Sequence, residues 1–145
     1  MNFLIINGPN LNLLGKREPG VYGSKSFPEF LDELRIEFSG HTIDYFQSNH
    51  EGELLDRIHD AEGKYAGIIL NAGAYTHTSI ALADAISAIN VPVVEVHISN
   101  IFKREKFRHV SKIAAVCGGS ISGFGLNSYI LGILSFLKPD AKTMA

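Results

Sequence analysis

The sequence is poor in cysteine: Cys117 is the only one among 145 residues. An internal disulfide is therefore impossible, and we expect a reducing compartment, the cytoplasm. The neighbours of Cys117 in the chain are largely apolar, which favours a buried packing residue over a nucleophile. Met1 and Asn2 lead directly into an apolar run, so we expect no signal peptide.

Strong charge and long apolar runs are also lacking. The net charge is −2 with a pI near 6.3, and the longest cationic cluster, residues 103–108, is interrupted by Glu105. No apolar stretch approaches the roughly 20 residues of a membrane-spanning helix. We therefore expect neither nucleic acid nor a membrane as a partner. A hydrophobic fraction of 46% weakly suggests surface that is buried between subunits.

Several common functional motifs are missing. The chain has no GxxxxGK[ST] phosphate-binding loop, and the glycines of residues 118–125 are too loosely spaced for a dinucleotide site. The histidines lack the spacing and the cysteine partners of a zinc site. A receiver domain would carry acidic residues where Asn7 and Asn71 stand, and a flavin carrier would need a tighter loop after its first strand. We expect no metal and no organic cofactor.

Strand and helix patterns alternate along the chain. Apolar runs predict strands at 3–6, 43–46, 66–70, 91–98 and 114–118, and helical spacing predicts helices at 27–40, 51–63, 78–89 and 126–137 with a short turn at 104–107. Such alternation indicates an α/β fold with a doubly wound parallel sheet in three layers. The flavodoxin-like arrangement of five strands fits the length, which is too short for a (β/α)8 barrel. We expect a single catalytic domain spanning residues 1–145.

Capping signals precede three of these helices. Ser26 and Glu29 form a capping-box pattern, and Ser48 and Glu51 repeat it. Thr78 is expected to cap the third helix.

The loop after the first strand is unusually long. Residues 8–25 are rich in glycine and proline, and a loop of this length inside a compact domain is usually functional or disordered. We favour a catalytic lid, in which Arg17 and Tyr22 are the residues most suited to take part in a reaction. A packing role for Tyr22 stays open, because a tyrosine base needs a strongly depressed pKa, which Arg17 could supply.

Polar residues follow three of the predicted strands, in residues 7–10, 71–78 and 97–100. Because strand ends meet at one edge of a parallel sheet, these residues should form one composite site. Asn71 and His77 suit a ligand rich in carboxylate or hydroxyl groups. Glu95 and His97 alternate along a strand, so they point to the same side, and the carboxylate can orient the imidazole as a proton donor. A structural histidine remains the alternative.

Four segments together resemble type II 3-dehydroquinate dehydratase. They are NGPNLNLLG (7–15), REPGVYG (17–23), LNAGAYTHTS (70–79) and EVHISN (95–100). The resemblance runs in order over essentially the whole chain. It implies dehydration of 3-dehydroquinate to 3-dehydroshikimate, in the shikimate pathway or in quinate breakdown, on a flavodoxin-like fold and without a cofactor.

The resemblance also implies roles for individual residues. Tyr22 would remove a proton from the carbon beside the ketone, with Arg17 holding the phenolate and Asn10 stabilising the enolate. His97, oriented by Glu95, would protonate the departing hydroxyl. The implied substrate-binding residues are Asn71, His77, Ile98, Ser99, Arg108 and Asp84, the last reaching the site of a neighbouring subunit. Trimers grouped into a dodecamer are the implied assembly.

Two other functions remain open at this point. A non-catalytic carrier or sensor of small molecules would need the segment 71–79 but no loop carrying both Arg17 and Tyr22. A different lyase could act on a related polyol acid.

Overall fold

Five parallel strands form one sheet in the computed structural model of the protein, which describes residues 1–16 and 24–138. The strands are β1 (Asn2–Asn7), β2 (Thr42–Gln47), β3 (Gly67–Asn71), β4 (Val93–His97) and β5 (Gly119–Ser122). Their order across the sheet is β2-β1-β3-β4-β5, and each neighbouring pair is parallel. This is the flavodoxin-like order, so the predicted fold class is confirmed.

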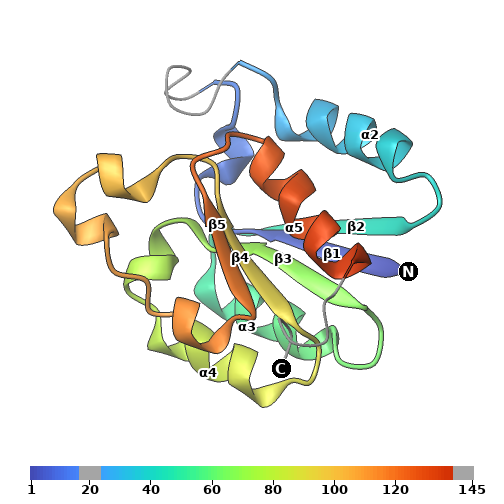
Figure 1. Ribbon diagram of the computed structural model, residues 1–145. Helices are drawn as coiled ribbons and strands as arrows, with labels where there is room; N and C mark the ends of the chain where they lie inside the picture. Colours follow the sequence, from blue (N-terminus) through green and yellow to red (C-terminus); the bar gives the residue numbers. More distant parts are fainter. Residues whose placement is uncertain (17–23, 139–145) are drawn as a thin grey trace.

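Helices cover both faces of the sheet (Figure 1). Helices α2 (Phe27–Glu37) and α5 (Asn127–Leu137) pack on one face, and α3 (Glu51–Asp60) and α4 (Ile80–Ala88) pack on the other. The chain runs outward from β1 to β2 and then returns to the other side of β1 to form β3. The three layers expected from the sequence are therefore present.

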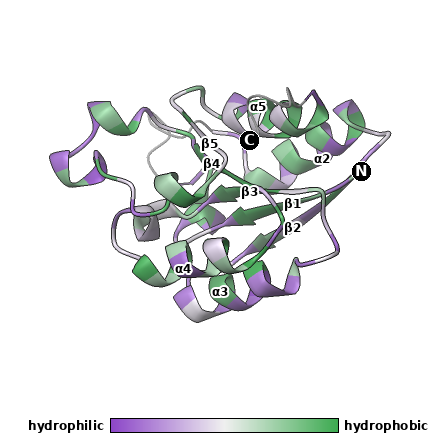
Figure 2. Cartoon of the chain, turned by 60° about the horizontal axis from the view of Figure 1, so that its bottom comes forward, coloured by the Kyte–Doolittle hydropathy of each residue, from purple (hydrophilic) through white to green (hydrophobic). Residues whose placement is uncertain are grey.

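Strand β1 shows how the sequence builds two cores. Phe3 and Ile5 pack with the residues of α2 and α5, whereas Leu4 and Ile6 pack with those of α3 and α4. All four side chains are fully buried, and each contributes about 1.5–3 kcal/mol to stability. A continuous apolar run is what a strand covered on both faces requires. Figure 2 shows the result as an apolar sheet between helices whose hydrophilic residues face outward.

The first predicted helix cap is confirmed, and the second is wrong. Ser26 caps α2, and its Oγ accepts a hydrogen bond from the Glu29 N–H. Before α3, the Ser48 Oγ instead accepts from the nearby His50 N–H at 2.9 Å and donates to Glu53 at 2.9 Å. Ser48 therefore closes a turn before the helix, and α3 begins one residue after His50.

The third predicted cap, Thr78, is also wrong, because Ser79 takes this role. A 3-10 helix, η2 (Gly73–His77), occupies the residues before α4. It brings the Ser79 Oγ within 2.9 Å of the Leu82 N–H, which donates to it.

The fifth predicted strand was placed too early, at residues 114–118. Ala114–Val116 form a 3-10 helix, η5, because the Ser111 Oγ accepts from the Ala114 N–H at 3.0 Å and turns the chain. The strand itself is the polar segment Gly119–Ser122, which pairs with β4. An edge strand that is partly exposed needs no apolar run, so periodicity could not reveal it.

The short helix predicted at 104–107 is likewise replaced by two 3-10 turns, η3 (Ile101–Lys103) and η4 (Lys106–Arg108). A further 3-10 turn, η1 (Leu11–Leu13), follows β1. Among the helices of residues 1–16 and 24–138, none is long and apolar enough to cross a membrane.

Candidate active site

Three strands end at one edge of the sheet in polar, buried residues. Asn7 ends β1, Asn71 ends β3 and His97 ends β4, and Asn7 is the cross-strand partner of Asn71. Between β1 and β3 the chain changes its direction of travel across the sheet, and ligands of open α/β sheets bind at such a point. A cavity opens there. Its lining includes Pro9, Asn10, Leu11, Leu13, Leu14, Asn71, Gly73, Ala74, His77, His97, Ile98, Ser99, Ile101, Arg104 and Arg108.

The Asn71 amide is held in one orientation. Its Oδ1 accepts from the Gly73 N–H at 3.2 Å, and its Nδ2 donates to the Tyr129 hydroxyl at 2.9 Å. That hydroxyl gives its own proton to the Asn7 Oδ1 at 2.7 Å, so toward Asn71 it can only accept. Because an amide nitrogen carries two N–H bonds, Asn71 can still donate to a ligand.

Tyr129 connects this network beneath the cavity. Its side chain is fully buried, and burial raises the pKa of the phenol above its ordinary value. The hydroxyl therefore stays protonated and keeps donating to Asn7. The Asn7 Nδ2 in turn contacts the Tyr45 hydroxyl at 3.4 Å.

Replacing Tyr129 by phenylalanine should lower the free energy of unfolding by about 2–4 kcal/mol, since it leaves two buried amide groups without their partner. The KM should rise as well, because Asn71 loses the contact that orients it. Urea unfolding at fixed protein concentration and steady-state kinetics measure the two effects. Tyr75→Phe is the control: it removes one exposed hydrogen bond, to the Asn49 carbonyl, and should cost well under about 1 kcal/mol. Equal losses in the two variants would contradict the prediction.

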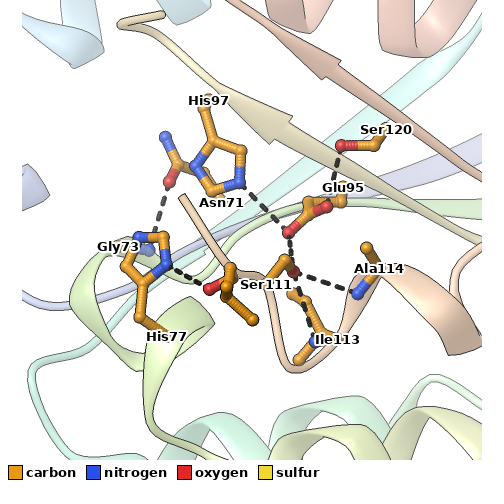
Figure 3. A network of polar contacts seen from close by, with 10 residues as sticks. Asn71, Gly73, His77, Glu95, His97, Ser111, Ile113, Ala114 and Ser120 are labelled. Carbon is orange, nitrogen blue, oxygen red and sulfur yellow. Dashed lines mark hydrogen bonds and ion pairs between the residues drawn. The ribbon is translucent and has the colours of Figure 1, made fainter. Parts of the chain in front are cut away.

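Strand β4 presents Glu95 and His97 on the same side of the sheet (Figure 3). The His97 Nε2 lies 3.1 Å from the Glu95 Oε2, and only 1% of the Glu95 side chain is exposed. Burial works to raise the pKa of Glu95, but hydrogen bonds from His97, Ser111 and Ser120 outweigh it and hold that pKa below its usual value. Glu95 is therefore a carboxylate, and it keeps a proton on the Nε2 of His97. The other ring nitrogen, Nδ1, lies on the side away from Glu95.

His77 has the opposite character. Its Nδ1 lies 2.8 Å from the Val110 carbonyl oxygen, which can only accept, so Nδ1 carries the proton. Partial burial lowers the pKa of His77, the hydrogen bond to Val110 opposes this, and the charges of His97 and Arg108 lower the pKa further, so the net shift is downward. At neutral pH His77 is thus an uncharged imidazole with Nε2 as an acceptor. Its ring lies 6.3 Å from that of His97, at an interplanar angle of 22°.

Arg108 supplies a fixed cation at the cavity. Its Nε lies 2.6 Å from the Glu105 Oε2, and its guanidinium carbon lies 5.1 Å from the centre of the Phe107 ring. Ile98 and Ser99 follow β4 directly and reach the same cavity. Together they present an apolar surface, a hydroxyl and a positive charge, which suit a hydroxylated carboxylic acid.

Asn10 begins the long loop in a constrained conformation. Its φ of 69° lies in the left-handed region, which asparagine tolerates better than most residues. The Asn10 N–H donates to the Asn49 Oδ1 at 2.9 Å, and the nearby Leu11 and Leu14 are buried in the core. The first part of the loop is therefore anchored. The two lid candidates, residues 17 and 22, lie outside the described residues.

The comparisons with known proteins agree on one family. The profile of the family described as "Dehydroquinase class II" matches residues 1–137. The chain belongs to this family. The resemblance inferred from the four sequence segments is thereby confirmed.

The relatives of this dehydroquinase are similar along almost their whole length. The chain is 58% identical over 136 residues to the 3-dehydroquinate dehydratase of Nostoc sp., covering 92% of each chain. It is 58% identical over 139 residues to that of Exiguobacterium sp., covering 95% of each. Among solved structures, the type II dehydroquinase of Butyrivibrio crossotus has a TM-score of 0.91 at 41% identity, covering 95% of this chain and 98% of that one.

Most of the residues expected at the dehydroquinase site line the one cavity described above: Asn10, Asn71, His77, His97, Ile98, Ser99 and Arg108. Glu95 lies behind His97 and contacts the cavity only through it. Asp84 does not line the cavity; it is exposed on α4. Arg17 and Tyr22 are the expected residues that fall outside the described part of the chain.

Sequence reasoning missed several residues of this dehydroquinase site. Arg104 lines the cavity, whereas Arg108 was the only arginine of the same cationic cluster that was expected there. The four-residue spacing of Arg104 and Arg108 was the available signal. Ser111 and Ser120 contact Glu95, and Tyr129 contacts Asn71. All three come from distant segments, so no local sequence pattern predicts these contacts.

Two other sources of chemistry, a metal ion and the Cys117 thiol, have little support in the described part of this dehydroquinase. Within residues 1–16 and 24–138, no group of three or more His, Cys, Asp or Glu side chains could hold a metal ion. Burial raises the pKa of the Cys117 thiol to about 12, and the charge of Glu95 adds to the effect. A thiol that stays protonated at neutral pH is a poor nucleophile.

Proposed function

We propose that this enzyme dehydrates 3-dehydroquinate to 3-dehydroshikimate through an enolate, in the shikimate pathway or in quinate breakdown. The observation that carries the proposal is the meeting of Asn71, His77, His97 and Arg108 around one cavity, with Glu95 behind His97. The relatives named 3-dehydroquinate dehydratase support the choice of substrate. A cytoplasmic location is part of the same proposal.

The first step is removal of a proton from the carbon beside the ketone. Tyr22 is the base, acting as a phenolate, and Arg17 is the cation that stabilises it. The electrons of the broken C–H bond move onto the ketone oxygen and form the enolate. Asn10 stabilises that oxyanion, partly through water, since a donor aimed at developing charge in a dry site lowers the barrier.

The second step is loss of the hydroxyl group. The enolate electrons return to form the carbon–carbon double bond, and the C–O bond breaks. Hydroxide leaves poorly, so His97 gives its proton to the departing oxygen and water is released. The ionised Glu95 lies 3.1 Å from the His97 Nε2 and orients the ring, so the proton that His97 gives is the one on Nδ1, the nitrogen on the side away from Glu95.

Binding of the substrate uses groups that keep one protonation state near neutral pH. Arg108 is permanently cationic and pairs with anionic or hydroxyl oxygens. The neutral His77 and the fixed Asn71 amide bind hydroxyl groups, and the Ile98–Ser99 segment binds through its backbone and its hydroxyl. Neither a metal nor an organic cofactor takes part in the proposed mechanism.

A direct assay tests the function. The product is a conjugated enone, so incubation of the purified protein with 3-dehydroquinate should produce a new ultraviolet absorption with enzyme-like saturation. The substrate incubated alone and with His97→Ala provides the baseline. Absence of the enone signal from the wild-type protein would refute the proposed activity.

We further propose that the enzyme assembles as trimers grouped into a dodecamer, with Asp84 completing the site of a neighbouring subunit. Large exposed apolar side chains support an assembly. Phe102, Phe107 and Val110 are 65%, 67% and 62% exposed within one short segment, and Ile80, at the start of α4, is 68% exposed. Large exposed apolar side chains that gather in one short segment are expected at interaction sites. Asp84 lies on the same helix as Ile80, and it does not line the cavity of its own subunit.

Asp84→Ala should lower kcat/KM about tenfold or more while leaving the oligomer intact in light scattering. Mixed oligomers provide the sharper test. When Asp84→Ala and His97→Ala chains are co-expressed, some sites receive His97 from one chain and Asp84 from its neighbour. Activity should therefore exceed the sum of the two separate variants. Asp56→Ala, an exposed carboxylate on α3, is the control and should match the wild type. No gain on mixing would remove Asp84 from the neighbouring site.

A further inference from the structure

Both carboxylate oxygens of Glu95 accept a hydrogen bond from a serine hydroxyl. The Ser120 Oγ donates to Oε1 at 2.8 Å, and the Ser111 Oγ donates to Oε2 at 2.6 Å. The same Oε2 lies 3.1 Å from the His97 Nε2. Figure 3 shows dashed contacts that reach the carboxylate from three directions, from Ser120, Ser111 and His97.

Ser111 can only act as a donor toward Glu95. Its Oγ accepts from two backbone groups, the Ile113 N–H at 3.3 Å and the Ala114 N–H at 3.0 Å. A hydroxyl has two lone pairs and one proton, so with both lone pairs engaged the proton is left for Glu95. A protonated Glu95 would find no acceptor at Ser111. The backbone turn at η5 therefore favours an unprotonated Oε2.

Among the titratable groups near Glu95, His97 on β4 also holds its pKa down, through the contact with Oε2. His77, on η2, also faces Glu95, and burial keeps it uncharged at neutral pH. Cys117, before β5, stays a protonated thiol. Arg108 is permanently charged and acts on His77. No second carboxylate in the described residues is among the groups that shift the pKa of Glu95.

We propose that Ser111 and Ser120 are positioning residues that keep Glu95 ionised and fixed, and through it hold His97 ready to protonate the leaving hydroxyl. The inference rests on the proposed function. Neither serine lines the cavity, so their effect on the reaction passes through Glu95. Without the two donors, only the contact with His97 would oppose the effect of burial, so the pKa of Glu95 would rise and His97 would keep a charged partner less firmly.

The test compares each serine variant in two backgrounds. Ser111→Ala and Ser120→Ala should each lower kcat about tenfold, the size of effect typical of a hydrogen bond to a charged group. In a Glu95→Gln background the same substitutions should change kcat less than about twofold, because the charge they stabilise is gone. Ser111→Thr keeps a hydroxyl and should restore most of the activity. Ser135→Ala removes a hydrogen bond to the Gly132 carbonyl on α5 and should leave kcat unchanged.

The pH profile provides the second measurement. Loss of a donor raises the pKa of Glu95, so the acidic limb of kcat should move toward higher pH in both serine variants. No such movement should occur in the Glu95→Gln background. Equal losses of kcat in both backgrounds, or an acidic limb that stays in place, would overturn the inference and leave Ser111 as a cap of η5. A wild-type protein that does not dehydrate 3-dehydroquinate would instead overturn the proposed function.

Discussion

Tyr22→Phe is expected to lower kcat by about 10³-fold or more, because the variant retains the ring and loses only the group that accepts the proton. Substrate binding should change little, since the hydroxyl acts on a C–H bond and not on a binding group of the ligand. Calorimetric titration of the variant with 3-dehydroquinate measures the affinity without the complication of turnover.

Tyr65→Phe is the matched control for this substitution. The Tyr65 hydroxyl donates to Asp44 at 2.6 Å and accepts from Arg57, and Tyr65 is not among the residues that line the cavity. Its kcat should equal that of the wild type. Turnover of Tyr22→Phe within tenfold of the wild type would exclude Tyr22 as the base and would favour the packing role that the sequence left open.

His97→Ala is expected to lower dehydration by about 10²–10⁴-fold, the usual contribution of a general acid. Formation of the enolate should persist, because in the proposed mechanism Tyr22 acts first and the proton it removes does not pass through His97. The variant should therefore exchange the proton beside the ketone with deuterium from solvent without forming product.

The exchange is followed by NMR of the substrate in deuterated buffer, with His59→Ala, an exposed histidine on α3, as the control for loss of an imidazole. Dehydration at the wild-type rate would remove His97 from the acid role. Loss of both exchange and dehydration would argue against a stepwise reaction through the enolate.

The elements predicted correctly are those whose own residues dictate them. Strands β1 and β3 are almost entirely apolar because helices cover them on both faces, and β4 is apolar except at Glu95 and His97. Helix α2 combines an apolar face with the Ser26 cap. The edge strand β5 was not predicted at its actual residues, because it is partly exposed and forms through its pairing with β4.

The candidate site likewise combines local contacts, which the sequence predicts, with long-range contacts, which it does not. Glu95 and His97 are two residues apart on one strand, so their proximity follows from the pleat alone. The serines that hold Glu95 come from 16 and 25 residues away. The bond from Tyr129 to Asn7 spans 122 residues. No local periodicity encodes contacts of this kind.

The order of residues was sufficient for the α/β architecture, for the family and for the residues that could carry its chemistry, since these depend on local patterns and short motifs. Protonation and orientation were decided only by the tertiary structure. Glu95 is ionised, His77 is neutral and the Asn71 amide points one way because burial removes water and distant groups replace it as donors and acceptors. Desolvation and hydrogen-bond geometry are properties of the folded chain, and they arise only when segments far apart in sequence are packed together.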